Sequence, residues 1–243
     1  MLNFWSKKTM MGNAKIKPIT FSAAASMQQW KVPAGVRKIH VDCAASQGMN
    51  GGKGGRVQCD LKVSPGQILY IMVGPVPSAL NGAAYNASDI RIGGSEYSNR
   101  VIVAGGGGNA SSRNAAGGAG GGLTGGAGSA HGNAGAGQGG SQSAGGAGGT
   151  CVPISVGHSH GGNAGVLGTG GAGGSCGYCG TWGAGGAGGA GYYGGGSGGA
   201  QWNKNGAFAA GGGGGSSYTK PELCSEVVHT QGFRSGAGYI ILS

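Results

Sequence analysis

A glycine stands at every third position from Gly162 to Gly189 without interruption. This repeat matches a threefold backbone helix such as polyproline II, whereas α-helices repeat at about 3.6 residues and strands at about two. A single threefold helix has no internal backbone hydrogen bonds. Segments with this repeat must therefore pack side by side, with N–H groups bonded to the carbonyls of neighbouring segments and with bare glycine faces in contact.

Two ordered structures share the repeat, the collagen triple helix and a bundle of polyglycine-II helices. Collagen-like chains need proline at about 15–20%, but this chain of 243 residues has only 7 prolines and none between Pro153 and Pro221. Disorder is a further alternative, because glycine loses much backbone entropy on folding. Residues 105–215, however, carry Val, Leu, Trp, Tyr, Phe and Cys and only two charged side chains, Arg113 and Lys204. We therefore expect a polyglycine-II bundle.

Short β-strands are predicted on both sides of this region, and no segment has amphipathic helical spacing of useful length. Apolar runs and alternating patterns predict strands at residues 36–43, 57–63, 68–73, 90–92 and 100–104. After the glycines, residues 217–218, 227–228 and 239–242 return to a strand-like composition. The strands after the glycines are expected to close the sheet begun before them. The sequence thus predicts four parts: a basic N-terminal arm (1–18), a first sandwich part (19–104), the bundle insertion (105–215) and a closing sandwich part (216–243).

Positive charge is concentrated near the N-terminus. The formal net charge is +10, and the first 38 residues contain basic side chains but no acid. Such a segment can favour nucleic acid, an anionic glycan, lipopolysaccharide or an acidic protein socket. Because no arginine–aromatic interleaving or recognised nucleic-acid fold accompanies it, we expect no nucleic-acid partner. We expect the arm to dock to other proteins of a particle through Phe4, Trp5, Lys7, Lys8, Lys15 and Lys17.

Hydropathy predicts no membrane insertion. No segment approaches the roughly 18 continuous apolar residues of a membrane span. The N-terminal residues also lack the apolar stretch of a secretory signal. We therefore expect synthesis in a host cytoplasm, so that a task outside the cell would require lysis, phage assembly or an upstream segment.

The sequence shows no recognisable catalytic or nucleotide-binding motif. Gly-X-Gly-X-X-Gly strings recur, but a dinucleotide loop needs a following helix and an acid about 20 residues on, and no acid lies between Glu96 and Glu222. The 6 acids show no pairing recognisable for glycoside hydrolysis, and the 5 histidines lack a credible nucleophile partner. We predict a non-enzymatic protein without a cofactor.

Four residues have side chains that suit zinc, namely His158, His160, Cys176 and Cys179. Their spacing is not that of a known zinc finger. The two cysteines lie one turn apart on a threefold helix and suit two packed thiols equally well. We predict no metal. Among the other cysteines, Cys43 and Cys59 make the best disulfide pair, and we slightly favour two buried thiols.

Bulky residues interrupt the glycine region and are expected at its surface or its turns. One straight helix over ten triplets would run about 93 Å, so the chain is expected to fold back at these points. Aromatic rings there can stack on sugars or anchor a protein partner, and amides can bond hydroxyl groups. Equally, the rings can cover the bundle or pack on the sandwich. The receptor-binding candidates are Tyr178, Trp182, Tyr192, Tyr193, Trp202, Asn203, Phe208 and Arg113.

An ordered series of motifs resembles the glycine-rich domain of bacterial and viral proteins. It includes Ile19-Thr-Phe, Trp30-Lys-Val-Pro-Ala-Gly-Val-Arg-Lys-Ile-His-Val, Gly51-Gly-Lys-Gly-Gly-Arg-Val, Ser64-Pro-Gly-Gln-Ile-Leu-Tyr-Ile-Met-Val-Gly74, Val101-Ile-Val-Ala-Gly-Gly-Gly-Gly, Ala210-Gly-Gly-Gly-Gly-Gly-Ser-Ser-Tyr and Gly236-Ala-Gly-Tyr-Ile-Ile. The order is similar to the glycine-rich extracellular region of anaplastic lymphoma kinase and leukocyte tyrosine kinase receptors. The resemblance implies an all-β fold with essentially no α-helix: a TNF-like, jelly-roll β-sandwich carrying a large inserted bundle of polyglycine-II helices.

The bundle alone also resembles the tail-fibre tip adhesins of T-even-like phages and, more loosely, the springtail antifreeze proteins. The leading hypothesis is a phage structural protein on the virion that presents its loops to a host glycan or outer-membrane protein, with a possible homo-oligomer. The alternatives are a purely architectural virion or filament subunit, an ice-binding protein and a secreted surface adhesin.

Overall fold

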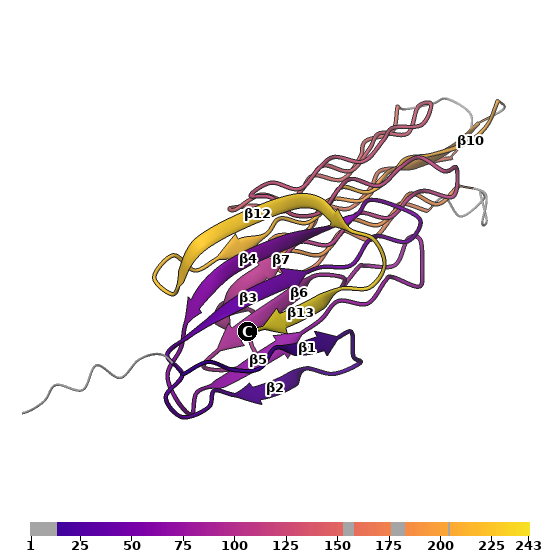
Figure 1. Ribbon diagram of the computed structural model, residues 1–243. Coiled ribbons are helices and arrows are strands. Elements are labelled where there is room, and N and C mark those ends of the chain that lie inside the picture. The colour runs from indigo at the N-terminus through magenta and orange to yellow at the C-terminus, as the bar shows by residue number, and fades with distance from the viewer. Residues whose placement is uncertain (1–13, 153–157, 176–182, 204) are drawn as a thin grey trace, which may run out of the picture.

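The computed structural model describes residues 14–152, 158–175, 183–203 and 205–243 (Figure 1). Its regular elements are β-strands and one short 3-10 helix, η1 (Tyr97–Asn99), and no α-helix occurs among these residues. The prediction of an all-β chain is therefore confirmed. No helix in the described part of the chain is long and apolar enough to cross a membrane.

Two five-stranded sheets form a β-sandwich. The first sheet has the order β1-β13-β3-β4-β12, and its strands are β1 (Ile19–Ser22), β13 (Tyr239–Leu242), β3 (Lys38–Ala44), β4 (Gly54–Lys62) and β12 (Cys224–Arg234). All four of its pairings are antiparallel. Alternation explains which face is inside: Ile39, Val41 and Cys43 are buried, whereas Lys38 and His40 are exposed.

The second sheet has the order β11-β7-β6-β5-β2 and is also antiparallel. Its strands are β11 (Tyr218–Thr219), β7 (Arg100–Ala104), β6 (Ser88–Ile92), β5 (Ile68–Met72) and β2 (Gln28–Lys31). One apolar core lies between the two sheets, and its largest fully buried side chains include Ile39, Leu61, Ile71, Ile90 and Ile102.

Strands from both sides of the glycine region share these sheets. β12 and β13, which follow that region, pair with β4 and β3, and β11 pairs with β7. The chain therefore leaves the sandwich after β7, traverses the glycine region and returns at β11. Figure 1 shows this region as a set of long segments that run away from the sheets.

Backbone hydrogen bonds join glycine segments that are far apart in the sequence. Gly189 N–H donates to Gly213 O (2.8 Å), Gly213 N–H donates to Gly196 O (2.8 Å), and Gly118 N–H donates to Gly212 O (2.8 Å). Glycines 211–215 are all buried. A Cβ at Gly213 would lie 2.1 Å from Gln138 O, so the close approach of these backbones excludes any side chain.

A small third sheet ends the glycine region on the side away from the sandwich (Figure 1). It has the order β10-β9-β8, with β8 at His158–His160, β9 at Ala200–Asn203 and β10 at Gly206–Ala209. We call this sheet, together with the adjacent turn at residues 131–134, the distal end. The turn belongs to it because the rings of His131 and Phe208 lie 5.8 Å apart.

Candidate functional sites at the two ends of the glycine region

The distal end exposes a tryptophan on a short sheet. Trp202 of β9 lies opposite His158 of β8 and Ala207 of β10. Residues opposite one another in a sheet project from the same face. The indole is 41% exposed, and His158 and His160 are exposed beside it. An exposed indole flanked by imidazoles and by a small alanine is a flat surface on which a sugar ring or an apolar side chain can stack.

The opposite face of this sheet is packed. Gln201 is fully buried and its amide donates to Val152 O. Phe208 packs against His131 at an interplanar angle of 45°, and a Cβ at Gly132, where φ is +56°, would lie 2.1 Å from the Phe208 ring. The distal sheet is therefore held from beneath, and Trp202 is presented on an ordered support.

The predicted receptor-binding residues separate into groups. Trp202, Asn203 and Phe208 share the β9–β10 hairpin, with Phe208 on the packed face. Arg113 is half-buried in another turn, where its N–H donates to Ser111 Oγ (3.1 Å). Tyr178 and Trp182 lie outside the described residues.

Tyr192 and Tyr193 lie at the sandwich, away from the distal sheet. Tyr192 stacks on Tyr218 of β11, with centroids 4.1 Å apart and planes at 11°, and meets Tyr193 edge-on at 5.5 Å. Both rings are half-buried. This is the packing role that the sequence left open as the alternative to receptor binding.

Arg100, a buried arginine of the second sheet, is hydrogen-bonded to this turn. Arg100 donates through Nη1 to Gly191 O (2.8 Å), through Nη2 to Tyr192 O (3.1 Å) and through Nε to Tyr97 O (3.2 Å). The centroid of the Tyr97 ring lies near two guanidinium groups, 4.8 Å from Arg100 Cζ and 4.9 Å from Arg91 Cζ. Burial lowers the pKa of Arg100 from its usual value. We call this region, where the glycine turns meet the second sheet, the junction.

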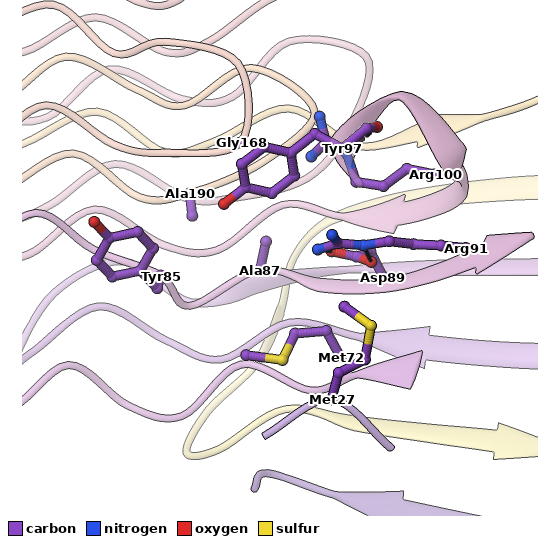
Figure 2. Close-up of a pocket in the computed structure, with 10 residues that line it drawn as sticks. All are labelled: Met27, Met72, Tyr85, Ala87, Asp89, Arg91, Tyr97, Arg100, Gly168 and Ala190. Carbon is purple, nitrogen blue, oxygen red and sulfur yellow. Dashed lines mark hydrogen bonds and ion pairs between the residues drawn. The ribbon is translucent and has the colours of Figure 1, made fainter. Parts of the chain in front are cut away.

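A cavity of about 220 Å³ opens at the junction (Figure 2). Arg91 holds Asp89 in a two-point ion pair, with Nε–Oδ1 at 2.6 Å and Nη2–Oδ2 at 3.0 Å. In Figure 2 Tyr97 lies above this pair, and Met27 and Met72 lie below it. Sequence reasoning missed the site, although one signal was present: Arg91 is a charged residue between two isoleucines in a predicted strand.

The sandwich end opposite the glycine region is basic. Ala14 N–H donates to Gly35 O (3.2 Å), which holds the segment that follows Ala14 beside the turn before β3. Lys15 and Lys17 of this segment are exposed. The adjacent exposed basic residues are Lys31, Arg37, Lys38 and Lys62. Asp60 pairs with Lys38 (2.8 Å) and His40 (3.0 Å), which lowers the pKa of Asp60. Phe4, Trp5, Lys7 and Lys8 lie outside the described residues.

The metal-binding side chains considered from the sequence are only partly described. His158 and His160 lie on the exposed face of β8, and Cys176 and Cys179 lie outside the described residues. Within the part of the chain that the structure describes, no group of three or more His, Cys, Asp or Glu side chains could hold a metal ion.

The four described cysteines are thiols. Cys43 and Cys59 are buried, and a hydrogen bond between Cys59 and Cys224 raises the pKa of Cys59. Cys59 therefore lies beside Cys224, a neighbour that the sequence did not suggest.

Comparison with known proteins adds no assignment to this geometry. The chain matches no protein-family model and no curated protein.

Proposed function

We propose that this chain is a non-enzymatic structural protein of a virus particle, most simply a phage, and that its distal end attaches the particle to a receptor or glycan on the host surface. The observation that carries the proposal is the exposed Trp202 on the distal sheet, with His158 opposite it and a packed face beneath. Aromatic residues on an ordered support are typical of binding hot spots, because little conformational entropy is lost when the partner binds.

The same proposal includes the finer fold. The three-residue glycine repeat, the hydrogen bonds between distant segments and the buried glycine faces support a polyglycine-II bundle. The shared antiparallel sheets support a TNF-like sandwich that carries this bundle as an insertion. A bundle of this kind is a stiff spacer, so it would hold the distal end away from the particle.

The basic end of the sandwich is the proposed attachment point to the particle. Lys31 and Lys62 are the last residues of β2 and β4, and Arg37 directly precedes β3. Figure 1 shows these ends of the three strands on the side opposite the distal sheet, and the three basic side chains are exposed, as are Lys15 and Lys17. Clustered positive charge of this kind favours an acidic protein socket. In this arrangement one end binds the particle while the other faces the host.

Cell binding by the purified full chain tests the proposal. Trp202→Ala should weaken binding to a susceptible bacterial strain by about tenfold or more, the loss typical of a hot-spot residue. Val166→Ala is the matched control, because Val166 is an exposed apolar residue outside the distal end. Thermal unfolding of both variants checks that the fold is intact.

Two results would contradict attachment. The chain could bind no strain in a broad panel, or the two variants could bind equally well. After either result, the position of the chain on the particle tests the architectural alternative. An assembly subunit occupies a repeating lattice, whereas an attachment protein occupies a tip.

A different observation supports ice binding as a second candidate. Exposed alanines and threonines recur every third residue in two segments, at Thr124, Ala127 and Ala130 and at Ala144, Ala147 and Thr150. A threefold helix repeats such positions about every 9.3 Å and so forms a regular face of small residues. Thermal hysteresis that Ala147→Lys abolishes and Trp202→Ala leaves intact would favour this function over attachment.

A further inference from the structure

Part of the lining of the junction cavity is apolar and can contact a hydrocarbon chain. Met27, Met72, Ala87 and Ala190 contribute apolar surface to it. Methionine side chains are unbranched and polarisable, so they adapt to ligands of different shape. Tyr85, which is 60% exposed, forms another part of the lining (Figure 2).

The same cavity is lined by more positive than negative charge. Arg91, Arg100 and Asp89 all contribute to the lining, and their exposed fractions are 7%, 4% and 4%. Asp89 forms its ion pair with Arg91, whereas the bonds of Arg100 go to three backbone carbonyls. Two guanidinium groups and one carboxylate leave one positive charge in excess, and an unbalanced buried charge is unfavourable without an anion.

Each guanidinium also retains donors. An arginine has five N–H groups. Arg100 uses three of them for Tyr97, Gly191 and Tyr192, which leaves two. Arg91 uses three for Asp89 and Ser95, which also leaves two. A guanidinium with two N–H groups to donate is well suited to a carboxylate.

We propose that the junction cavity is a binding site for a small organic carboxylate with an apolar body, such as a short-chain fatty acid. The carboxylate group accepts hydrogen bonds from the guanidinium side and balances the excess charge. The hydrocarbon chain lies along Met27 and Met72. This site is separate from the distal end and does not depend on the proposed attachment function.

The site joins the two parts of the fold. Ala87, Asp89 and Arg91 come from β6 or the residue before it, whereas Gly168 and Ala190 come from the glycine region. Gly168, where φ is +83°, lies against Tyr97, because a Cβ there would be 2.7 Å from the ring. A bound carboxylate would therefore contact both parts and stabilise the folded chain by mass action.

A matched ligand series on the full chain tests the proposal. Hexanoate, hexanol and hexylammonium share one hydrocarbon body and differ in charge. Methionine-methyl NMR reports binding directly, with the signals of Met27 and Met72 assigned by single substitutions to leucine. Hexanoate should shift both signals in a saturable way and leave that of Met49 unchanged. Hexanol and hexylammonium should bind at least about tenfold more weakly, because neither carries a negative charge.

The variant Arg100→Gln tests whether the excess positive charge in the cavity binds the carboxylate. It should lower the affinity for hexanoate by about tenfold or more and leave that for hexanol unchanged, since it removes the excess charge. If this variant does not fold, the ligand series on the unmodified chain decides alone. Equal binding of hexanoate and hexanol, or no saturable shift with any of the three, would overturn the proposal.

Discussion

Single glycines decide where the segments of the glycine region can approach one another. At Gly213 a Cβ would meet Gln138 O at 2.1 Å, a backbone atom that cannot rotate away. At Gly161 the nearest atom to a Cβ is Gly149 O at 3.4 Å, which is ordinary contact. Neither residue has a positive φ, so packing alone distinguishes them.

Alanine substitutions at these two positions should therefore differ. Gly213→Ala should lower the free energy of unfolding by at least about 1–3 kcal/mol, because the added methyl group forces two backbones apart. Gly161→Ala should be neutral or stabilising by up to about 1 kcal/mol, because it restricts the unfolded chain. Urea unfolding of both variants measures the difference. Equal stabilities would contradict the tight backbone packing.

His229 provides a pH test at the residue scale. Burial lowers the pKa of His229 in the folded chain, and its Nδ1 is buried without a hydrogen-bond partner. As the pH falls below about 6.5, the unfolded chain takes up this proton before the folded chain does. The stability that neutral His229 provides is thus present above pH 6.5 and is lost below it. His229→Gln should reduce the loss of stability between about pH 7 and pH 5. Identical pH profiles would contradict this.

Burial of charged and aromatic residues was the part of the junction that the sequence could not predict. The pattern Ile90-Arg91-Ile92 predicts a strand but does not indicate what packs against its arginine. In the structure the turns of the glycine region cover the face that carries this arginine, and Arg91 is buried against Asp89. Tyr192 is covered for the same reason. Local pattern identifies the strand, whereas burial depends on a segment about a hundred residues away.

Among the elements, apolar strands were the most predictable. Residues 100–104 coincide with β7, and residues 68–73 extend one residue beyond β5. β12 was recognised only at Val227-Val228, because its remaining residues are mostly polar and it lies at a sheet edge. β8, β9 and β10 gave no strand signal, because they are short and rich in small or polar residues.

The contact between the glycine region and the second sheet can be measured with a double-mutant cycle. Tyr192 stacks on Tyr218, and Arg100 lies 5.3 Å from the Tyr192 centroid. Tyr192→Leu and Tyr218→Leu should each destabilise the chain, with a coupling energy of about 0.5–1.5 kcal/mol between them. A cycle of Tyr192 with Tyr70, which lies elsewhere on that sheet, is the control. A coupling energy of zero for the stacked pair would exclude its role in joining the two parts.

At the scale of the whole molecule, opposite ends have different surfaces. Exposed basic residues gather where the sandwich ends, and the exposed tryptophan lies on the distal sheet. Composition located the basic segment, because charge is visible in the sequence. The distal end required the structure, because His158 and Trp202 become neighbours only when the glycine region folds back on itself.

Hydroxyl-radical footprinting of the full chain bound to the surface of a susceptible bacterium tests attachment through the distal end most directly. Trp202 and Tyr85 are both exposed aromatic residues, and Tyr85 lies at the junction. If the distal end binds the host, binding should lower the oxidation of Trp202 by about tenfold and leave that of Tyr85 unchanged, because a hot-spot residue is shielded from water in the complex. Protection of Tyr85 or of the basic end, with Trp202 still fully reactive, would contradict attachment through the distal end.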